Sequence, residues 1–85
     1  MASLNLTSRR GPDRLSRRVD EMLAAYVEWR KHSADSRSAY RLWCESTPCE
    51  RKVRFAGYLA ALDQEESAAE TYARIVADVA RRLER

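Results

Sequence analysis

Thiol and carboxylate groups lie close together in one segment, CESTPCE (residues 44–50), which contains both cysteines of the chain. A zinc site needs about four Cys, His or carboxylate ligands at suitable spacing. The single histidine, His32, lies about three helical turns before Cys44. A thioredoxin-like site needs C-x-x-C in a βαβ unit, whereas four residues separate Cys44 from Cys49. We therefore predict no metal site and expect the segment to form a corner of the chain. A disulfide across this corner is geometrically conceivable, although cytosolic thiols normally remain reduced, so the sequence leaves the redox state of Cys44 and Cys49 open.

Other catalytic patterns are missing from the sequence as well. It has no Gly-rich phosphate loop, no Ser-His-Asp set and no HExxH motif. The adjacent carboxylates Glu65 and Glu66 fit a charged helix surface. We predict that the protein is not an enzyme, with no catalytic residues and no cofactor.

The composition favours one small helical domain. Of the 85 residues, 45% are hydrophobic and 34% charged, and only two are glycine and two proline. This scarcity of helix breakers favours long helices over strands. No run of about 18 apolar residues could cross a membrane, and residues 1–12 lack a secretory signal, so we expect a cytoplasmic protein. We expect a flexible basic tail over residues 1–11 and a single domain over residues 12–85.

Two heptad stripes predict two long helices, over residues 13–46 and 48–84. The first stripe contains Leu15, Val19, Met22, Tyr26, Trp29, Ser33, Ser36, Tyr40 and Trp43. The second contains Phe55, Leu59, Leu62, Glu66, Ala69, Ala73, Val76, Ala80 and Leu83. The fold class that follows is all-α, an antiparallel two-helix hairpin about 50 Å long.

The junction between the helices has the pattern of a capping box. Thr47 is the expected N-cap, Pro48 the first helical residue, and Glu50 the residue that reaches back to the Thr47 amide. In the register that we predict, Tyr40 faces Phe55, and large residues mostly face small ones. The alternative is a compact bundle of four shorter helices, with breaks at 32–36 and 63–66.

A second apolar strip on each helix predicts an association surface, because two helices hide only one narrow seam. Its residues are Leu23, Val27, Tyr58, Tyr72, Ile75 and Val79. A homodimer that forms a four-helix bundle, or a helical protein partner, would cover this strip. The predicted function is that of a non-enzymatic adaptor, scaffold or regulatory subunit.

Arginines gather at both ends of the chain, which a hairpin brings together. They are Arg9, Arg10, Arg14, Arg17, Arg18, Arg81, Arg82 and Arg85. Acidic residues lie among them, and Asp78 has the four-residue spacing to Arg82 that favours an ion pair on a helix. The alternative function is therefore a nucleic-acid-associated accessory protein that contacts phosphates with this end.

Overall fold

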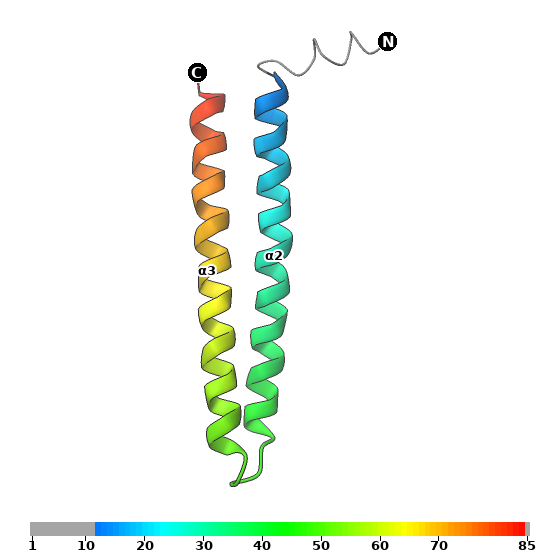
Figure 1. Cartoon of the computed structure of the whole chain (residues 1–85), viewed down its shortest axis with the longest axis vertical. Coiled ribbons are helices and arrows are strands. Elements are labelled where there is room, and N and C mark those ends of the chain that lie inside the picture. The colour runs from blue at the N-terminus through cyan, green and yellow to red at the C-terminus, as the bar shows by residue number, and fades with distance from the viewer. Residues whose placement is uncertain (1–11, 85) are drawn as a thin grey trace, which may run out of the picture.

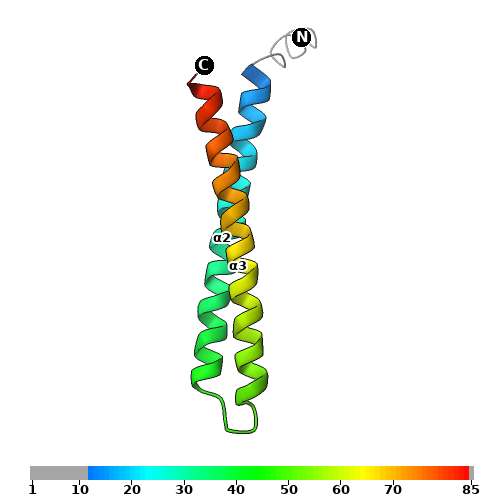
Figure 2. The ribbon, with the colours of Figure 1, turned by 90° about the vertical axis from the view of Figure 1, so that its left-hand side faces the viewer.

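Two antiparallel helices make up the part of the chain that the structure, a computed structural model, describes, which is residues 12–84. Helix α2 spans Pro12–Cys44 and helix α3 spans Arg51–Leu83, each with 33 residues. They lie side by side along their whole length and are joined by a short turn (Figures 1 and 2). The radius of gyration is 19.4 Å, whereas a compact domain of this length would have about 12 Å.

The predicted all-α hairpin is therefore confirmed. Both helices continue through residues 32–36 and 63–66, so the alternative of four shorter helices is wrong. Neither helix contains a stretch apolar enough to cross a membrane. The predicted tail over residues 1–11 lies outside the described residues.

The turn forms half of the predicted capping box. The Thr47 amide donates to Glu50 Oε1 at 3.3 Å, as expected of a residue that reaches back. The Glu50 amide donates to the Thr47 carbonyl at 3.0 Å, which closes a tight i to i+3 turn before the regular helix. The first turn therefore includes Pro48 and Cys49, and α3 begins at Arg51 instead of at residue 48. The other helix ends at Cys44, two residues before the predicted end.

The stripe predicted on α2 lies in the seam between the helices. At seven-residue spacing Leu15, Met22, Trp29 and Trp43 are half-buried, and Ser36 is buried. These residues project from one side of the helix, because seven residues make about two turns. The heptad pattern thus correctly predicted which side of α2 faces α3.

The seam of α3 differs from the predicted stripe. Its centre contains Tyr58, Glu65, Tyr72 and Val79, whereas Leu59, Ala73 and Ala80 of the predicted stripe are exposed. In the observed register, Tyr40 contacts Tyr58 instead of Phe55, and Tyr26 contacts Tyr72 instead of Ala69. The second helix is therefore rotated about its axis and displaced by three residues from the expected pairing. Aromatic rings face each other where we predicted that large residues would face small ones.

Candidate functional site

The segment that contains both cysteines forms the closed end of the hairpin. Both thiols are free and exposed. The described residues bring together no group of three or more His, Cys, Asp or Glu side chains that could hold a metal ion. A hydrogen bond to Cys44 raises the pKa of the Tyr40 hydroxyl above its ordinary value. Cys44 therefore lies beside the aromatic residues of the seam, because Tyr40 in turn contacts Tyr58.

Four aromatic side chains pack across the seam beside the turn. Trp43 lies 4.9 Å from Phe55 and 5.8 Å from Tyr58 between ring centroids, and its ring is nearly parallel to that of Tyr58. Tyr40 contacts Tyr58 edge-on at 5.4 Å. Such offset and edge-to-face pairs add about 0.5–1.5 kcal/mol each beyond the area that they bury.

A second aromatic cluster lies near the middle of the hairpin. Tyr72 of α3 stacks on Trp29 at 5.5 Å and contacts Tyr26 at 5.6 Å. Tyr72 therefore packs between the two helices, although we predicted it on the association surface. Tyr58 and the half-buried Ile75 also lie in or beside the seam, and only 6% of Val79 is exposed.

Only Leu23 and Val27 of the six predicted association residues are largely exposed, at 55% and 57%. The hairpin thus buries most of one apolar strip of α3 against its own α2, and leaves the stripe that we had assigned to the seam partly exposed.

A polar pair interrupts the apolar seam. The hydroxyl oxygen of the buried Ser36 lies 2.6 Å from Glu65 Oε1 and 3.0 Å from the Ser33 carbonyl oxygen. The hydroxyl has one proton, which it can donate to only one of these two acceptors at a time. Because a one-residue slip would separate the serine from the glutamate, this pair favours the observed register.

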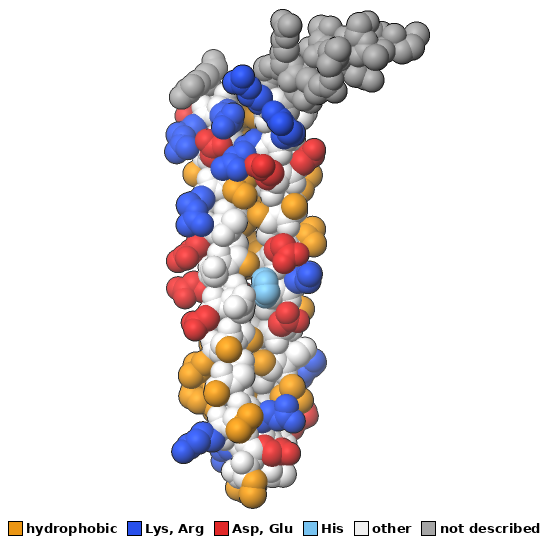
Figure 3. Space-filling model, in the orientation of Figure 1, with side chains coloured by type: hydrophobic (Ala, Val, Ile, Leu, Met, Phe, Trp, Pro, Cys, Tyr) orange, Lys and Arg blue, Asp and Glu red, His pale blue; other side chains and the backbone are white. Residues whose placement is uncertain are grey.

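One face of the hairpin is polar along its middle. A hollow of about 300 Å³ there is lined by Glu28, His32, Gln64, Ser67 and Thr71, among others. We call this side of the two helices the polar face. Figure 3 looks onto it and shows charged and other polar side chains along its middle and at the open end of the hairpin.

The opposite face also has hollows. One is lined by Ala34, Arg37, Tyr40 and Tyr58, and another by Trp29, Leu62, Glu66 and Ala69. On α2, Arg37 and Tyr40 project from the side of the seam opposite to His32. On α3, Leu62 and Glu66 project from the side opposite to Gln64. Both hollows therefore belong to the face opposite the polar face.

Large apolar side chains gather on this opposite face. Tyr26 is two heptads from Tyr40, Val27 is one heptad from Ala34, and Leu59 is one heptad from Glu66, so each projects to the same side as its counterpart. We call this surface the apolar face, and it comprises Leu23, Tyr26, Val27, Tyr40, Phe55, Leu59 and Leu62. These side chains are 36% to 57% exposed. Among residues 14–84 only Val79 and Ser36 are buried, with 6% and 5% of each residue exposed.

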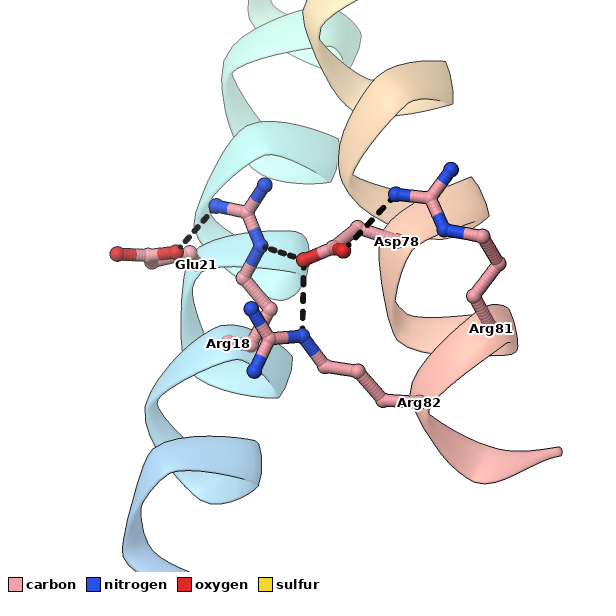
Figure 4. Close-up of polar contacts among 5 residues, drawn as sticks. All are labelled: Arg18, Glu21, Asp78, Arg81 and Arg82. Carbon is pink, nitrogen blue, oxygen red and sulfur yellow. Dashed lines mark hydrogen bonds and ion pairs between the residues drawn. The ribbon is translucent and has the colours of Figure 1, made fainter. Parts of the chain in front are cut away.

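An ion-pair network joins the two helices at the open end (Figure 4). Asp78 of α3 accepts a hydrogen bond from Arg18 Nε of α2 at 2.8 Å. It also accepts hydrogen bonds from Arg81 and Arg82 of its own helix, both at 3.0 Å. Arg18 donates a second hydrogen bond, to Glu21, at 2.6 Å. The predicted pair between Asp78 and Arg82 is therefore present, and Asp78 also links the helices.

The guanidinium groups strongly perturb this carboxylate. The hydrogen bond from Arg18 has the largest effect on the pKa of Asp78, and desolvation, the next largest, opposes it. With the further lowering by Arg82 and Arg81, the pKa falls from 3.8 to about 2. Arg14 and Arg17 line the same hollow as Arg18, Glu21, Asp78 and Arg82. The structure thus brings together the predicted arginines from both ends of the chain that it describes. Arg9, Arg10 and Arg85 lie outside the described residues.

The comparisons with known proteins give no relative: no protein-family model, curated protein or solved structure matches this chain. The features of this chain that bear on its function are therefore the two faces of the hairpin and its open end. The sequence placed Tyr26, Tyr40, Phe55, Leu59 and Leu62 in the seam, and did not predict that 36% to 47% of each would remain exposed on one face of the hairpin.

Proposed function

We propose that the protein is a non-enzymatic helical interaction protein that works by self-association, with two hairpins packing apolar face against apolar face in a four-helix bundle. The observation that carries this proposal is the apolar face itself. Seven large apolar side chains remain 36% to 57% exposed on one side of a hairpin that buries almost no core within its described residues. Large apolar side chains gathered on one exposed face mark an interaction site, and small two-helix units are stabilised by association.

Charges on the same face favour a second copy as the occupant. Arg30 and Arg37 of α2 are one heptad apart, and Glu66 of α3 lies between their levels, at about residues 32 to 35, given the contacts of Tyr40 with Tyr58 and of Ser36 with Glu65. When each α2 lies on the partner's α3 with both closed ends together, Glu66 falls between the partner's Arg30 and Arg37. The two-fold axis repeats this contact, so one surface supplies both signs of charge.

Side-chain sizes agree with the same arrangement. Leu23 and Val27 lie at the level of Ala73 and Val76 of α3, where that helix presents small or half-buried side chains. The large α2 residues of one copy would then pack over the smaller α3 residues of the other, as interdigitated helix packing requires.

Light scattering on two double variants tests this proposal. Val27→Glu with Leu59→Glu places charges on the apolar face. Leu42→Glu with Val53→Glu is the matched control, because these side chains are 48% and 73% exposed but each lies two residues from a member of the apolar face and so projects elsewhere. Wild type and control should be dimers, and the apolar-face variant should not.

The expected magnitude follows from the exposed area. Val27 and Leu59 are 57% and 45% exposed, so about half of the roughly 2 kcal/mol for complete burial remains available to each. Four such side chains in a symmetric dimer give about 4 kcal/mol, which is about a thousandfold in the dissociation constant.

A wild-type protein that is a folded monomer at all concentrations would overturn the proposal, as would equal weakening by the control. For the orientation, Glu66→Arg should weaken the dimer, and combining it with Arg30→Glu and Arg37→Glu should restore it. Failure of this rescue would exclude the arrangement with both closed ends together.

A further inference from the structure

We infer that the open end of the hairpin is a binding site for phosphate groups, formed by the arginine cluster of Arg14, Arg17, Arg18, Arg81 and Arg82. The cluster draws on both helices, so it exists only when the hairpin is folded. It lies at the end opposite the turn and on the polar face, away from the proposed dimer contact.

Positive charge exceeds negative charge at this place. The hollow there has a volume of about 310 Å³ and is lined by four arginines, Arg14, Arg17, Arg18 and Arg82, and by two carboxylates, Glu21 and Asp78. Four positive and two negative charges leave a net charge of +2 around the hollow. Arg81, which donates to the same Asp78, adds another positive charge at its edge.

The arginines also retain unused hydrogen-bond donors. Each guanidinium has five N–H groups. Three guanidinium groups converge on the two oxygens of Asp78, to which Arg81 and Arg82 each donate a single hydrogen bond at 3.0 Å. Within the described residues, most N–H groups of Arg81 and Arg82 therefore remain available to another acceptor.

Asp78 acts as an internal acceptor that holds these side chains in place. By bridging Arg18 to Arg82, it fixes guanidinium groups from both helices around one hollow before any ligand arrives. The low pKa of Asp78, about 2, reflects the positive potential at this position. Asp20 does not reduce that potential directly, because it lies two residues after Arg18 and projects to the other side of α2.

Phosphate is the anion that this geometry fits best. Guanidinium groups bind phosphate oxygens through paired N–H donors, and several of them from different directions match the several oxygens of one phosphoryl group or of two adjacent ones. Such groups occur in free diphosphates and in the backbone of nucleic acids. Aromatic side chains are lacking among the cluster residues, so phosphate contact without base stacking is expected.

Two double variants with equal loss of charge test the site. Arg14→Gln with Arg17→Gln removes two lining guanidinium groups and leaves the bridge between Arg18 and Asp78 intact. Arg51→Gln with Arg54→Gln is the matched control at the closed end, where both residues are exposed. Circular dichroism checks that each variant is folded.

Binding is measured with two ligands at low salt: inorganic pyrophosphate by calorimetry, and a labelled single-stranded oligonucleotide by fluorescence anisotropy. We expect the open-end variant to lose at least about tenfold in affinity and the control to lose little. Pyrophosphate binding identifies a site for free phosphates. Binding of the oligonucleotide alone, weakening with added salt, identifies a nucleic-acid backbone as the ligand.

Three results would overturn the inference. Wild type could bind neither ligand at low salt. Both double variants could lose affinity equally, which would show that net charge alone matters. The open-end variant could also remain folded and bind as tightly as wild type. The dimer measurement is independent of all three, because the arginine cluster and the apolar face share no residue.

Discussion

Replacing Tyr72 by alanine tests whether this residue packs in the seam between the helices or lies on the outer surface. Its ring lies 5.5 Å from that of Trp29 and 5.6 Å from that of Tyr26, both on the other helix. Removing a fully buried large aromatic side chain costs about 3–5 kcal/mol. Because Tyr72 is half-buried and takes part in two ring pairs of about 0.5–1.5 kcal/mol each, we expect Tyr72→Ala to lower the free energy of unfolding by about 2–3 kcal/mol.

Urea unfolding followed by circular dichroism at one fixed protein concentration measures this loss. The control is Leu42→Ala, a side chain that is 48% exposed and lies outside the apolar face, for which we expect a change of less than about 0.5 kcal/mol. A double-mutant cycle with Trp29→Ala should give a coupling of about 0.5–1.5 kcal/mol between the two stacked rings.

The opposite pattern would refute the observed rotation of α3. If Tyr72→Ala left unfolding unchanged but weakened self-association, Tyr72 would lie on the outer surface, where the sequence alone had placed it. A coupling energy near zero with Trp29 would have the same meaning, because these rings would then not be in contact.

Three further predictions concern polar contacts. Ser36→Ala should cost about 1–2 kcal/mol in urea unfolding, since Glu65 loses its hydroxyl partner, and adding Glu65→Leu should recover much of it. The pKa of Asp78 is 3.8 in the unfolded chain and about 2 in the folded one. The ionised carboxylate therefore stabilises the hairpin fully above about pH 4, and this stabilisation is lost as the pH falls through 2. Urea midpoints measured against pH should show the loss, and the Asp78→Asn variant should lack this pH dependence. Glu50→Ala removes the carboxylate that accepts from the Thr47 amide, and should cost about 0.5–1 kcal/mol in the same unfolding assay. An unchanged midpoint for Ser36→Ala or Glu50→Ala, or an unchanged acid profile for Asp78→Asn, would contradict the corresponding contact.

The sequence predicts the hairpin because the decisive signals are local. Uninterrupted heptads and the absence of Gly and Pro from residue 13 to residue 46 determine a continuous first helix, and the reach of Glu50 to Thr47 is a contact three residues long. Because the two helices of a hairpin are antiparallel and of similar length, the arginine-rich start of the first helix then lies beside the arginine-rich end of the second. Each of these inferences depends on spacing within one helix or across one turn.

The rotation of α3 depends on contacts between helices, which spacing does not encode. Two apolar strips with the same heptad period exist on this helix, one through Leu59 and the other through Tyr58, Tyr72 and Val79. Contact with the aromatic residues of α2 selects the second strip. The polar residues do not decide between the strips, because each contains one glutamate, Glu66 in the first and Glu65 in the second, and only the folded hairpin pairs Ser36 with Glu65.

The position of the two candidate surfaces has a consequence for a dimer of the proposed kind. The apolar face and the arginine cluster lie on opposite sides of the hairpin, so pairing through the first leaves the second uncovered. With both closed ends together, both open ends also lie together, and each presents its arginine cluster on an outer side of the bundle. One dimer would then hold two phosphate sites at the same end, and a ligand long enough to reach both would bind more tightly than a single phosphate group through its higher effective concentration. Separating the subunits with Val27→Glu and Leu59→Glu should remove this gain for a long oligonucleotide and leave pyrophosphate binding unchanged, because each hairpin contains a complete arginine cluster.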